Sequence, residues 1–107
     1  MQHLSTRALA EWLADPERQP PVLLDVREEW EIELCALAGI IHIPMQQVPV
    51  RLSALDTEKE LVVICHHGVR SMQVVMFLER QGFKALFNLT GGMAAWADEV
   101  DSSMRRY

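Results

Sequence analysis

Cysteine is scarce in this sequence, and long apolar runs are absent. Only two of the 107 residues are cysteines, Cys35 and Cys65, which is too few for a disulfide framework and fits a reducing compartment better. The opening stretch, residues 1–17, is interrupted by acidic residues and has the pattern of neither a signal peptide nor a membrane-spanning helix. We therefore expect a cytoplasmic protein that has no membrane partner.

Positive charge is also in short supply. Lysine and arginine number 10 against 15 aspartates and glutamates, which gives a formal net charge of −5. This balance argues against nucleic acid or an acidic membrane surface as the main partner. An anionic substrate would need a local positive potential to bind.

Internal repeats and low-complexity tracts are missing as well. Half of the residues are apolar, and the length fits one domain with a core large enough to fold without disulfide bonds. We expect a single domain over residues 1–107, in which residues 101–107 form a frayed polar tail. Nothing in the sequence requires more than a monomer.

The stretch Leu61–Ser71, LVVICHHGVRS, changes abruptly from apolar to polar. Leu61–Cys65 has no polar alternation, which is typical of a strand buried on both faces of a sheet. His66–Ser71 has the composition of a short polar loop, and a helical pattern of apolar residues follows from Met72. The sequence therefore predicts a strand, a tight loop and a helix N-terminus, with a cysteine at the first corner.

Such a corner can activate a thiol. Backbone N–H groups of a tight loop that leads into a helix can converge on one point, where they and the helix dipole favour an anion. The same field lowers the pKa of a thiol and favours the nucleophilic thiolate. Arg70 can add a permanent charge and a planar fork of donors that matches an oxyanion.

A lone cysteine that ends an apolar strand is more often a core residue. However, a core strand end has no need of a glycine-containing loop that carries an arginine. We therefore predict that Cys65 and Arg70 are catalytic. The predicted substrate-binding residues are the rest of the loop together with Arg70: His66, His67, Gly68, Val69, Arg70 and Ser71.

His66 and His67 have two interpretations. Either imidazole, if protonated near neutral pH, would lower the pKa of Cys65 further. Side chains of a loop whose N–H groups point inward nevertheless tend to point outward, so plain solvent exposure is an equal alternative. No metal or other cofactor is expected, because three adjacent residues do not converge easily on one tetrahedral ion and no C-x2-C motif completes a set.

The rest of the chain alternates between strand and helix patterns. Helices are predicted at residues 6–14, 28–35, 72–81 and 93–100, with a short one within 45–55, and strands at 22–24, 39–43, 61–65 and 83–87. This alternation implies a parallel sheet covered on both sides. The loops at the carboxyl ends of its strands gather at one edge, where we expect Asp25, His42, residues 65–71 and a turn at 88–92 to meet.

Several residues near this edge have mainly structural interpretations. Asp25 and Arg27 are expected to anchor loops or cap a helix, and His42 to be a satisfied structural histidine. The acidic run Glu28–Glu33 is expected to be a solvated helix face, with only a weak case for a partner. Cys35 is either buried filler or a resolving thiol that meets Cys65.

Four segments in order resemble the rhodanese-type sulfurtransferases. Cys65–Ser71 resembles the active loop of that family, and residues 24–28 with Glu31 resemble the segment that closes its second strand. Gly39–Pro44, GIIHIP, resembles its Gly-Ala-hydrophobic-x-Ile-Pro segment, although the histidine that usually precedes that segment is missing here. Asn88–Gly92, followed by Trp96, resembles its C-terminal signature.

The resemblance implies a single-domain α/β fold in which a five-stranded parallel sheet has helices on both faces. It also implies that Cys65 attacks the outer sulfur of thiosulfate, keeps it as a persulfide and passes it to cyanide or a biological thiol, while sulfite leaves. The loop amides and Arg70 would stabilise the anionic sulfur. The implied partners are a small anionic sulfur donor and a thiol or protein acceptor, and no cofactor is implied.

Three rival functions remain as alternatives. A cysteine-dependent phosphatase or arsenate reductase would place five residues between cysteine and arginine, whereas four stand between Cys65 and Arg70 here. The tighter loop suits a single sulfur better than a tetrahedral phosphate. A non-catalytic binding module is the second rival, although both Cys65 and Arg70 are present. The third is a sulfur relay that works only when it is docked to a partner.

Overall fold

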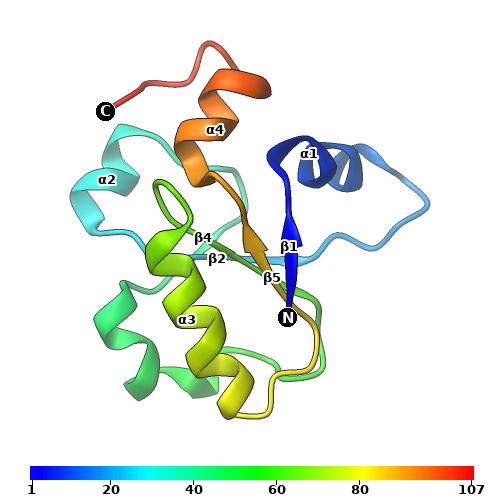
Figure 1. Ribbon diagram of the computed structural model, residues 1–107, viewed down its shortest axis with the longest axis vertical. Coiled ribbons are helices and arrows are strands. Elements are labelled where there is room, and N and C mark those ends of the chain that lie inside the picture. The colour runs from blue at the N-terminus through cyan, green and yellow to red at the C-terminus, as the bar shows by residue number, and fades with distance from the viewer.

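Five parallel strands form one sheet in the computed structural model, which describes residues 1–107 (Figure 1). The strands are Gln2–Leu4 (β1), Val22–Asp25 (β2), Ile41–His42 (β3), Leu61–Ile64 (β4) and Leu86–Leu89 (β5). The α-helices are Thr6–Ala14 (α1), Glu29–Leu34 (α2), Val69–Arg80 (α3) and Gly92–Glu99 (α4), and two 3-10 helices, Met45–Val50 (η1) and Leu52–Ala54 (η2), precede β4. None of these helices combines the length and apolar character needed to cross a bilayer.

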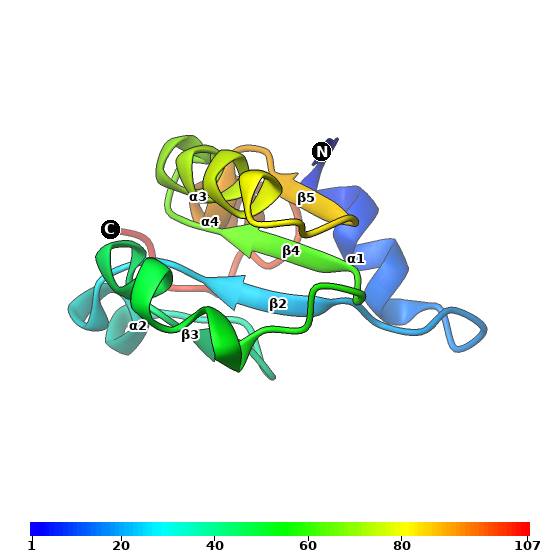
Figure 2. The same cartoon turned by 90° about the horizontal axis from the view of Figure 1, so that it is seen from below.

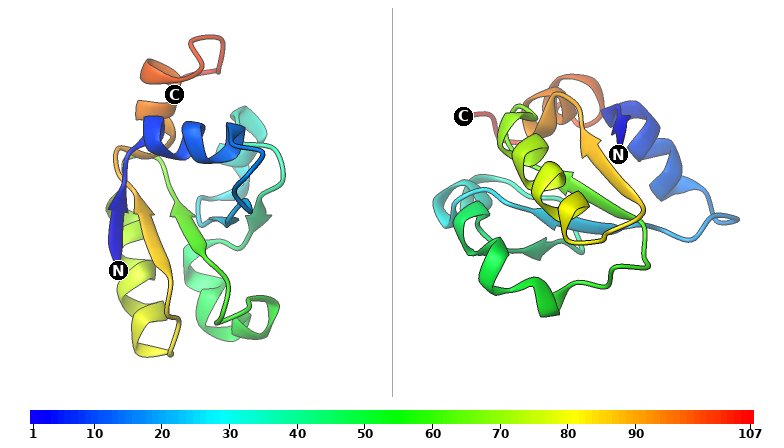
Figure 3. Two further views of the ribbon diagram at one scale, coloured as in Figure 1. Left: turned by 90° about the vertical axis from the view of Figure 1, so that its right-hand side faces the viewer. Right: turned by 60° about the horizontal axis from the view of Figure 1, so that its bottom comes forward.

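The strand order is β1-β5-β4-β2-β3, so β4 lies at the centre of the sheet. Leu61, Val63 and Cys65 pack into the core beneath α3 and η1, while Val62 and Ile64 pack against α1 and α4 on the other face. The two layers can be followed in Figures 2 and 3. The expected α/β fold, a parallel sheet with helices on both faces, is thus confirmed.

The predicted strand at residues 83–87 is displaced in the structure, where β5 is Leu86–Leu89. The displacement arises because Phe83 is part of the C-terminal cap of α3, three residues beyond the last helical residue, Arg80. The Phe83 N–H donates to the carbonyl of Leu78 at 3.2 Å, and Gly82, at φ 91°, donates to Glu79 at 3.2 Å, which together make a Schellman cap. As a result, Asn88 lies within a strand and is buried, rather than in the predicted turn.

Other element boundaries also differ from the sequence pattern. Residues 2–4, to which the pattern assigned no structure, form the edge strand β1 and pair with β5. The strand predicted at 39–43 shortens to Ile41–His42. The α3 helix begins at Val69 rather than at Met72, so Arg70 and Ser71 lie in its first turn and not in the loop.

A buried ion pair joins Asp25 to Arg27 where β2 ends. Both side chains are fully buried, and the guanidinium meets the carboxylate at 2.8 Å from Nη2 to Oδ2. Arg27 also donates to the carbonyl of Cys35 at 2.7 Å, and the Arg27 carbonyl is 2.6 Å from Nε2 of His42. The expected anchoring roles of Asp25, Arg27 and His42 are therefore confirmed.

We expect Arg27→Met to lower the free energy of unfolding by about 3 kcal/mol, because it leaves the buried Asp25 carboxylate without its partner. Urea denaturation followed by circular dichroism measures this loss. Arg7→Met is the matched control, since Arg7 is exposed on α1, and it should change the value by less than about 0.5 kcal/mol. Equal midpoints for the two variants would show that the pair does not anchor the fold.

Candidate active site

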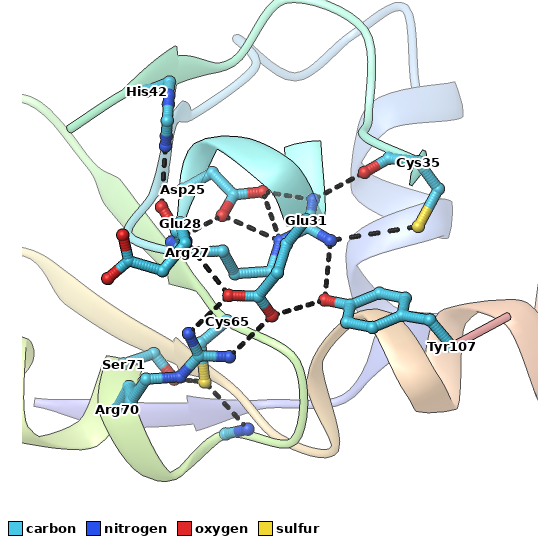
Figure 4. Close-up of polar contacts among 11 residues, drawn as sticks. Asp25, Arg27, Glu28, Glu31, Cys35, His42, Cys65, Arg70, Ser71 and Tyr107 are labelled. Carbon is cyan, nitrogen blue, oxygen red and sulfur yellow. Dashed lines mark hydrogen bonds and ion pairs between the residues drawn. The ribbon is translucent and has the colours of Figure 1, made fainter. Parts of the chain in front are cut away.

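The sulfur of Cys65 lies at the carboxyl end of β4 and is enclosed by the loop that follows (Figure 4). The Gly68 N–H donates to Sγ at 3.0 Å, and the thiol donates to the Ser71 hydroxyl at 3.3 Å. Gly68 adopts a left-handed conformation, with φ 98°, immediately before α3. The loop therefore brings a backbone N–H and the N-terminus of α3 to the sulfur.

Ser71 and Asn88 support the loop from its buried side. The Ser71 hydroxyl donates to Oδ1 of Asn88, and Nδ2 of Asn88 donates to the carbonyl of Gly68 at 3.2 Å. These bonds join the first turn of α3, the loop and β5 beneath the sulfur. Ser71 thus contacts the sulfur from inside the core. Asn88 is a site residue that the sequence pattern placed in a turn.

The N-terminus of α4 packs directly onto the loop. Met93 and Ala94 donate their backbone N–H groups to the carbonyls of Cys65 and His66, at 2.9 and 3.0 Å. Gly92 permits this approach, because a Cβ at its position would lie 2.4 Å from the Cys65 oxygen and 2.5 Å from the His66 oxygen. The loop carbonyls are therefore satisfied from behind by α4.

Arg70 is bound by Glu31, a residue that the sequence pattern placed on a solvated face. Its Nη1 and Nη2 donate to the two carboxylate oxygens of Glu31, at 2.6 and 2.9 Å. Glu31 is 2% exposed and also accepts the Glu28 N–H at 3.0 Å, in a capping box at the start of α2. The prediction of a solvated acidic face is right for Glu28, Glu29 and Glu33 and wrong for Glu31.

The pairing with Glu31 changes the expectation that the planar donor groups of Arg70 face an oxyanion. The fork is directed at Glu31 and not at a free oxyanion position. The hydrogen bonds from Arg70 lower the pKa of Glu31 to about 2, and those same bonds raise the pKa of Arg70. Both groups are therefore ionised at neutral pH. The spacing Glu28-x-x-Glu31 is a local signal of a capping box, and it could have revealed the inward carboxylate.

The C-terminal tail is anchored, whereas the sequence pattern predicts fraying over residues 101–107. The Tyr107 hydroxyl accepts from Nη1 of Arg27 at 2.9 Å and donates to Oε2 of Glu31 at 2.7 Å. Arg106 donates to the Ala97 carbonyl at 2.9 Å. These contacts bring the C-terminus beside α2 (Figure 1). No periodic pattern pointed to Tyr107, because it is a single aromatic residue at the end of a polar segment.

His66 and His67 lie at the rim of the loop. The ring of His66 stacks on Tyr107, at 3.9 Å between centroids, and meets the ring of His67 at a tilt of 41°, at 4.0 Å. Burial, followed by the nearby His67, lowers the pKa of His66. This direction argues against an imidazolium at His66 near neutral pH. His67 is exposed, as the outward-pointing alternative expects, while His66 is half-buried.

Cys35 caps the end of α2 and packs with the core on the α1 and α4 face, whereas Cys65 belongs to the core beneath α3. The Sγ of Cys35 lies 3.8 Å from Nη1 of Arg27, and the Cys35 carbonyl accepts a hydrogen bond from the same guanidinium. Placement on opposite faces of the sheet favours the interpretation of Cys35 as a packing residue.

Comparison with known proteins agrees with this geometry. Residues 6–99 match the family model described as a rhodanese-like domain. The chain is similar to the putative sulfurtransferase YtwF of Bacillus subtilis, with 42% identity over 101 residues and 94% of each chain covered. It is also similar to the thiosulfate sulfurtransferase GlpE of Coxiella burnetii, with 35% identity over 75 residues and 70% of each chain covered. A solved rhodanese-like domain protein from Staphylococcus aureus superposes with a TM-score of 0.85, at 33% identity, over 94% of this chain and 95% of that one.

We expect Gly92→Ala to lower the free energy of unfolding by about 3 kcal/mol, since the new Cβ would collide with loop carbonyls as well as strain the backbone. Gly39→Ala is the matched control. Gly39 also has a positive φ, of 79°, but no atom lies within 4 Å of its added Cβ, so strain alone should cost about 1 kcal/mol. Urea unfolding of both variants measures the difference, and equal losses would show that α4 does not press on the loop.

Proposed function

Because the chain belongs to the rhodanese-like domain family, we propose that it is a sulfurtransferase in which Cys65 carries a sulfane sulfur. The donor is a small anion such as thiosulfate, and the acceptor is cyanide or a thiol. The observation that carries the proposal is the position of Sγ, which is held at 3.0 Å from the Gly68 N–H at the N-terminus of α3. Two free cysteines fit a reducing, cytoplasmic setting for this chemistry.

The reaction needs two displacements at sulfur. The Cys65 thiolate attacks the outer sulfur of thiosulfate, the sulfur–sulfur bond breaks, and sulfite leaves with the bonding electrons. The acceptor then attacks the terminal sulfur of the persulfide, and the Cys65 thiolate is released as the new bond forms. Both steps start from or generate an anionic sulfur within the loop, where the Gly68 N–H and the helix N-terminus stabilise it.

The ion pair of Arg70 and Glu31 carries no net charge, so the role of Arg70 depends on where its guanidinium lies. Its positive charge is balanced by Glu31, so the pair places the positive end of a dipole near the loop. The side chain of Arg70 is 35% exposed, which leaves part of the guanidinium accessible to an incoming anion. We assign it the role of attracting the donor and stabilising charge that builds on the transferred sulfur.

A cysteine-dependent phosphatase or arsenate reductase is the alternative function. It uses the same residue types, but the loop holds a single sulfur with four residues between Cys65 and Arg70. A larger tetrahedral ion needs more converging donors than this short loop supplies. Transferase chemistry also agrees with the names of the similar proteins.

We expect the purified protein to gain the mass of one sulfur atom after incubation with thiosulfate, and to lose it on addition of cyanide or a thiol. Intact mass spectrometry measures both changes. Cys65→Ser should abolish the gain, while Cys35→Ser, which removes the only other thiol, should retain it. Hydrolysis of an aryl phosphate by a wild-type protein that never gains the sulfur would overturn the proposal.

We expect Arg70→Lys to slow persulfide formation about tenfold, because a lysine keeps the charge but cannot make the paired bonds to Glu31. Single-turnover kinetics with thiosulfate measures the rate. Arg80→Lys, an exposed change at the other end of α3, should leave the rate unchanged. An unaltered rate for Arg70→Lys would remove the arginine fork from the mechanism.

A further inference from the structure

The hydroxyl of Tyr107 connects two ion pairs that otherwise do not meet (Figure 4). One is the buried pair of Asp25 and Arg27 at the end of β2, and the other is the pair of Glu31 and Arg70 beside the loop. Tyr107 lies outside residues 6–99, which match the rhodanese-like family model. The connection is therefore a feature that the family match does not explain.

The direction of the Tyr107 hydroxyl is fixed by its partners. A guanidinium can only donate, so the Tyr107 oxygen accepts from Arg27, and its single proton goes to Glu31. Burial raises the pKa of Tyr107 to about 12, so the hydroxyl keeps this proton at neutral pH. The Tyr107 hydroxyl is thus the donor in its hydrogen bond to Glu31.

This bond completes the surroundings of the Glu31 carboxylate. Oε1 accepts from Arg70 and from the Glu28 N–H, while Oε2 accepts from Arg70 and from Tyr107. Without Tyr107, Oε2 would have only its bond to Arg70, and one of the four hydrogen bonds that resist rotation of the carboxylate would be lost. Since Arg70 is bound through both oxygens, rotation of the carboxylate would move its guanidinium.

The ring of Tyr107 holds the hydroxyl in place. It stacks on His66 at 3.9 Å with an interplanar angle of 11°, and it meets Trp30 edge-on at 5.7 Å. These contacts do not involve the hydroxyl. The two functions of the side chain, packing by the ring and hydrogen bonding by the oxygen, can therefore be separated by a single substitution.

We propose that Tyr107 is a positioning residue for sulfur transfer, whose hydroxyl fixes Glu31 and through it the guanidinium of Arg70, in the first turn of the helix that follows the Cys65 loop. The inference rests on the function proposed above for Cys65. It makes the C-terminal segment part of the active site. Tyr107 touches the loop through its ring, which stacks on His66. Its hydroxyl instead contacts Arg27 and Glu31, so the effect of the hydroxyl on the reaction passes through Arg70.

Tyr107→Phe tests the inference, because phenylalanine retains the ring and removes the hydroxyl. We expect the second-order rate of persulfide formation with thiosulfate to fall about fivefold to tenfold, which is the typical net effect of losing one hydrogen bond. The pH at which Cys65 becomes reactive to iodoacetamide should move upward, since a displaced Arg70 stabilises the thiolate less. Ser102→Ala, an exposed change in the same C-terminal segment, should change neither value.

A double-mutant cycle separates positioning from general stability. In the Arg70→Lys background, Tyr107→Phe should slow the reaction no further, because both changes act on the same guanidinium. Multiplicative losses, or a pH profile of Tyr107→Phe that matches the wild type, would overturn the inference. If wild-type protein forms no persulfide, the proposed function fails instead, and the alkylation profile still decides whether Tyr107 tunes Cys65.

Discussion

One buried carboxylate, that of Glu31, holds together the parts of the molecule that surround the sulfur. It receives hydrogen bonds from its own helix, from Arg70 at the start of α3 and from Tyr107 at the C-terminus. Its pKa, lowered to about 2 chiefly by Arg70, lies below the ordinary value of 4.5. The ionised form therefore stabilises the fold above that ordinary value, and this contribution is lost as the pH falls toward 2.

The loop itself depends on close backbone approach rather than on charge. β4 is buried on both faces, and α4 satisfies the carbonyls of Cys65 and His66 only because Gly92 has no side chain. With its carbonyls bound from behind and Gly68 in a left-handed conformation, the loop turns an N–H toward the sulfur. A rigid centre and a short loop thus produce the anion-stabilising corner that the chemistry requires.

The sequence predicted those features that depend on local pattern, and it missed those that depend on a distant polar partner. The buried central strand, the parallel sheet and the cysteine corner follow from apolar runs and a glycine-containing loop, and the structure has them all. The predicted position of β5 was wrong because Phe83 caps α3 instead of starting a strand. The pairing of Glu31 with Arg70 and the role of Tyr107 were missed because the partners, Arg70 and Arg27, lie far away in the chain, where periodicity carries no information.

A crystal structure determined after soaking with thiosulfate would show directly whether Cys65 carries a sulfane sulfur within this loop. We expect electron density for one additional sulfur bonded to Sγ of Cys65, with its negative charge facing the N–H groups at the start of α3. Cys35 should be unmodified in the same crystal. An unmodified Cys65, or an added sulfur on Cys35 alone, would show that Cys65 is not the sulfur carrier.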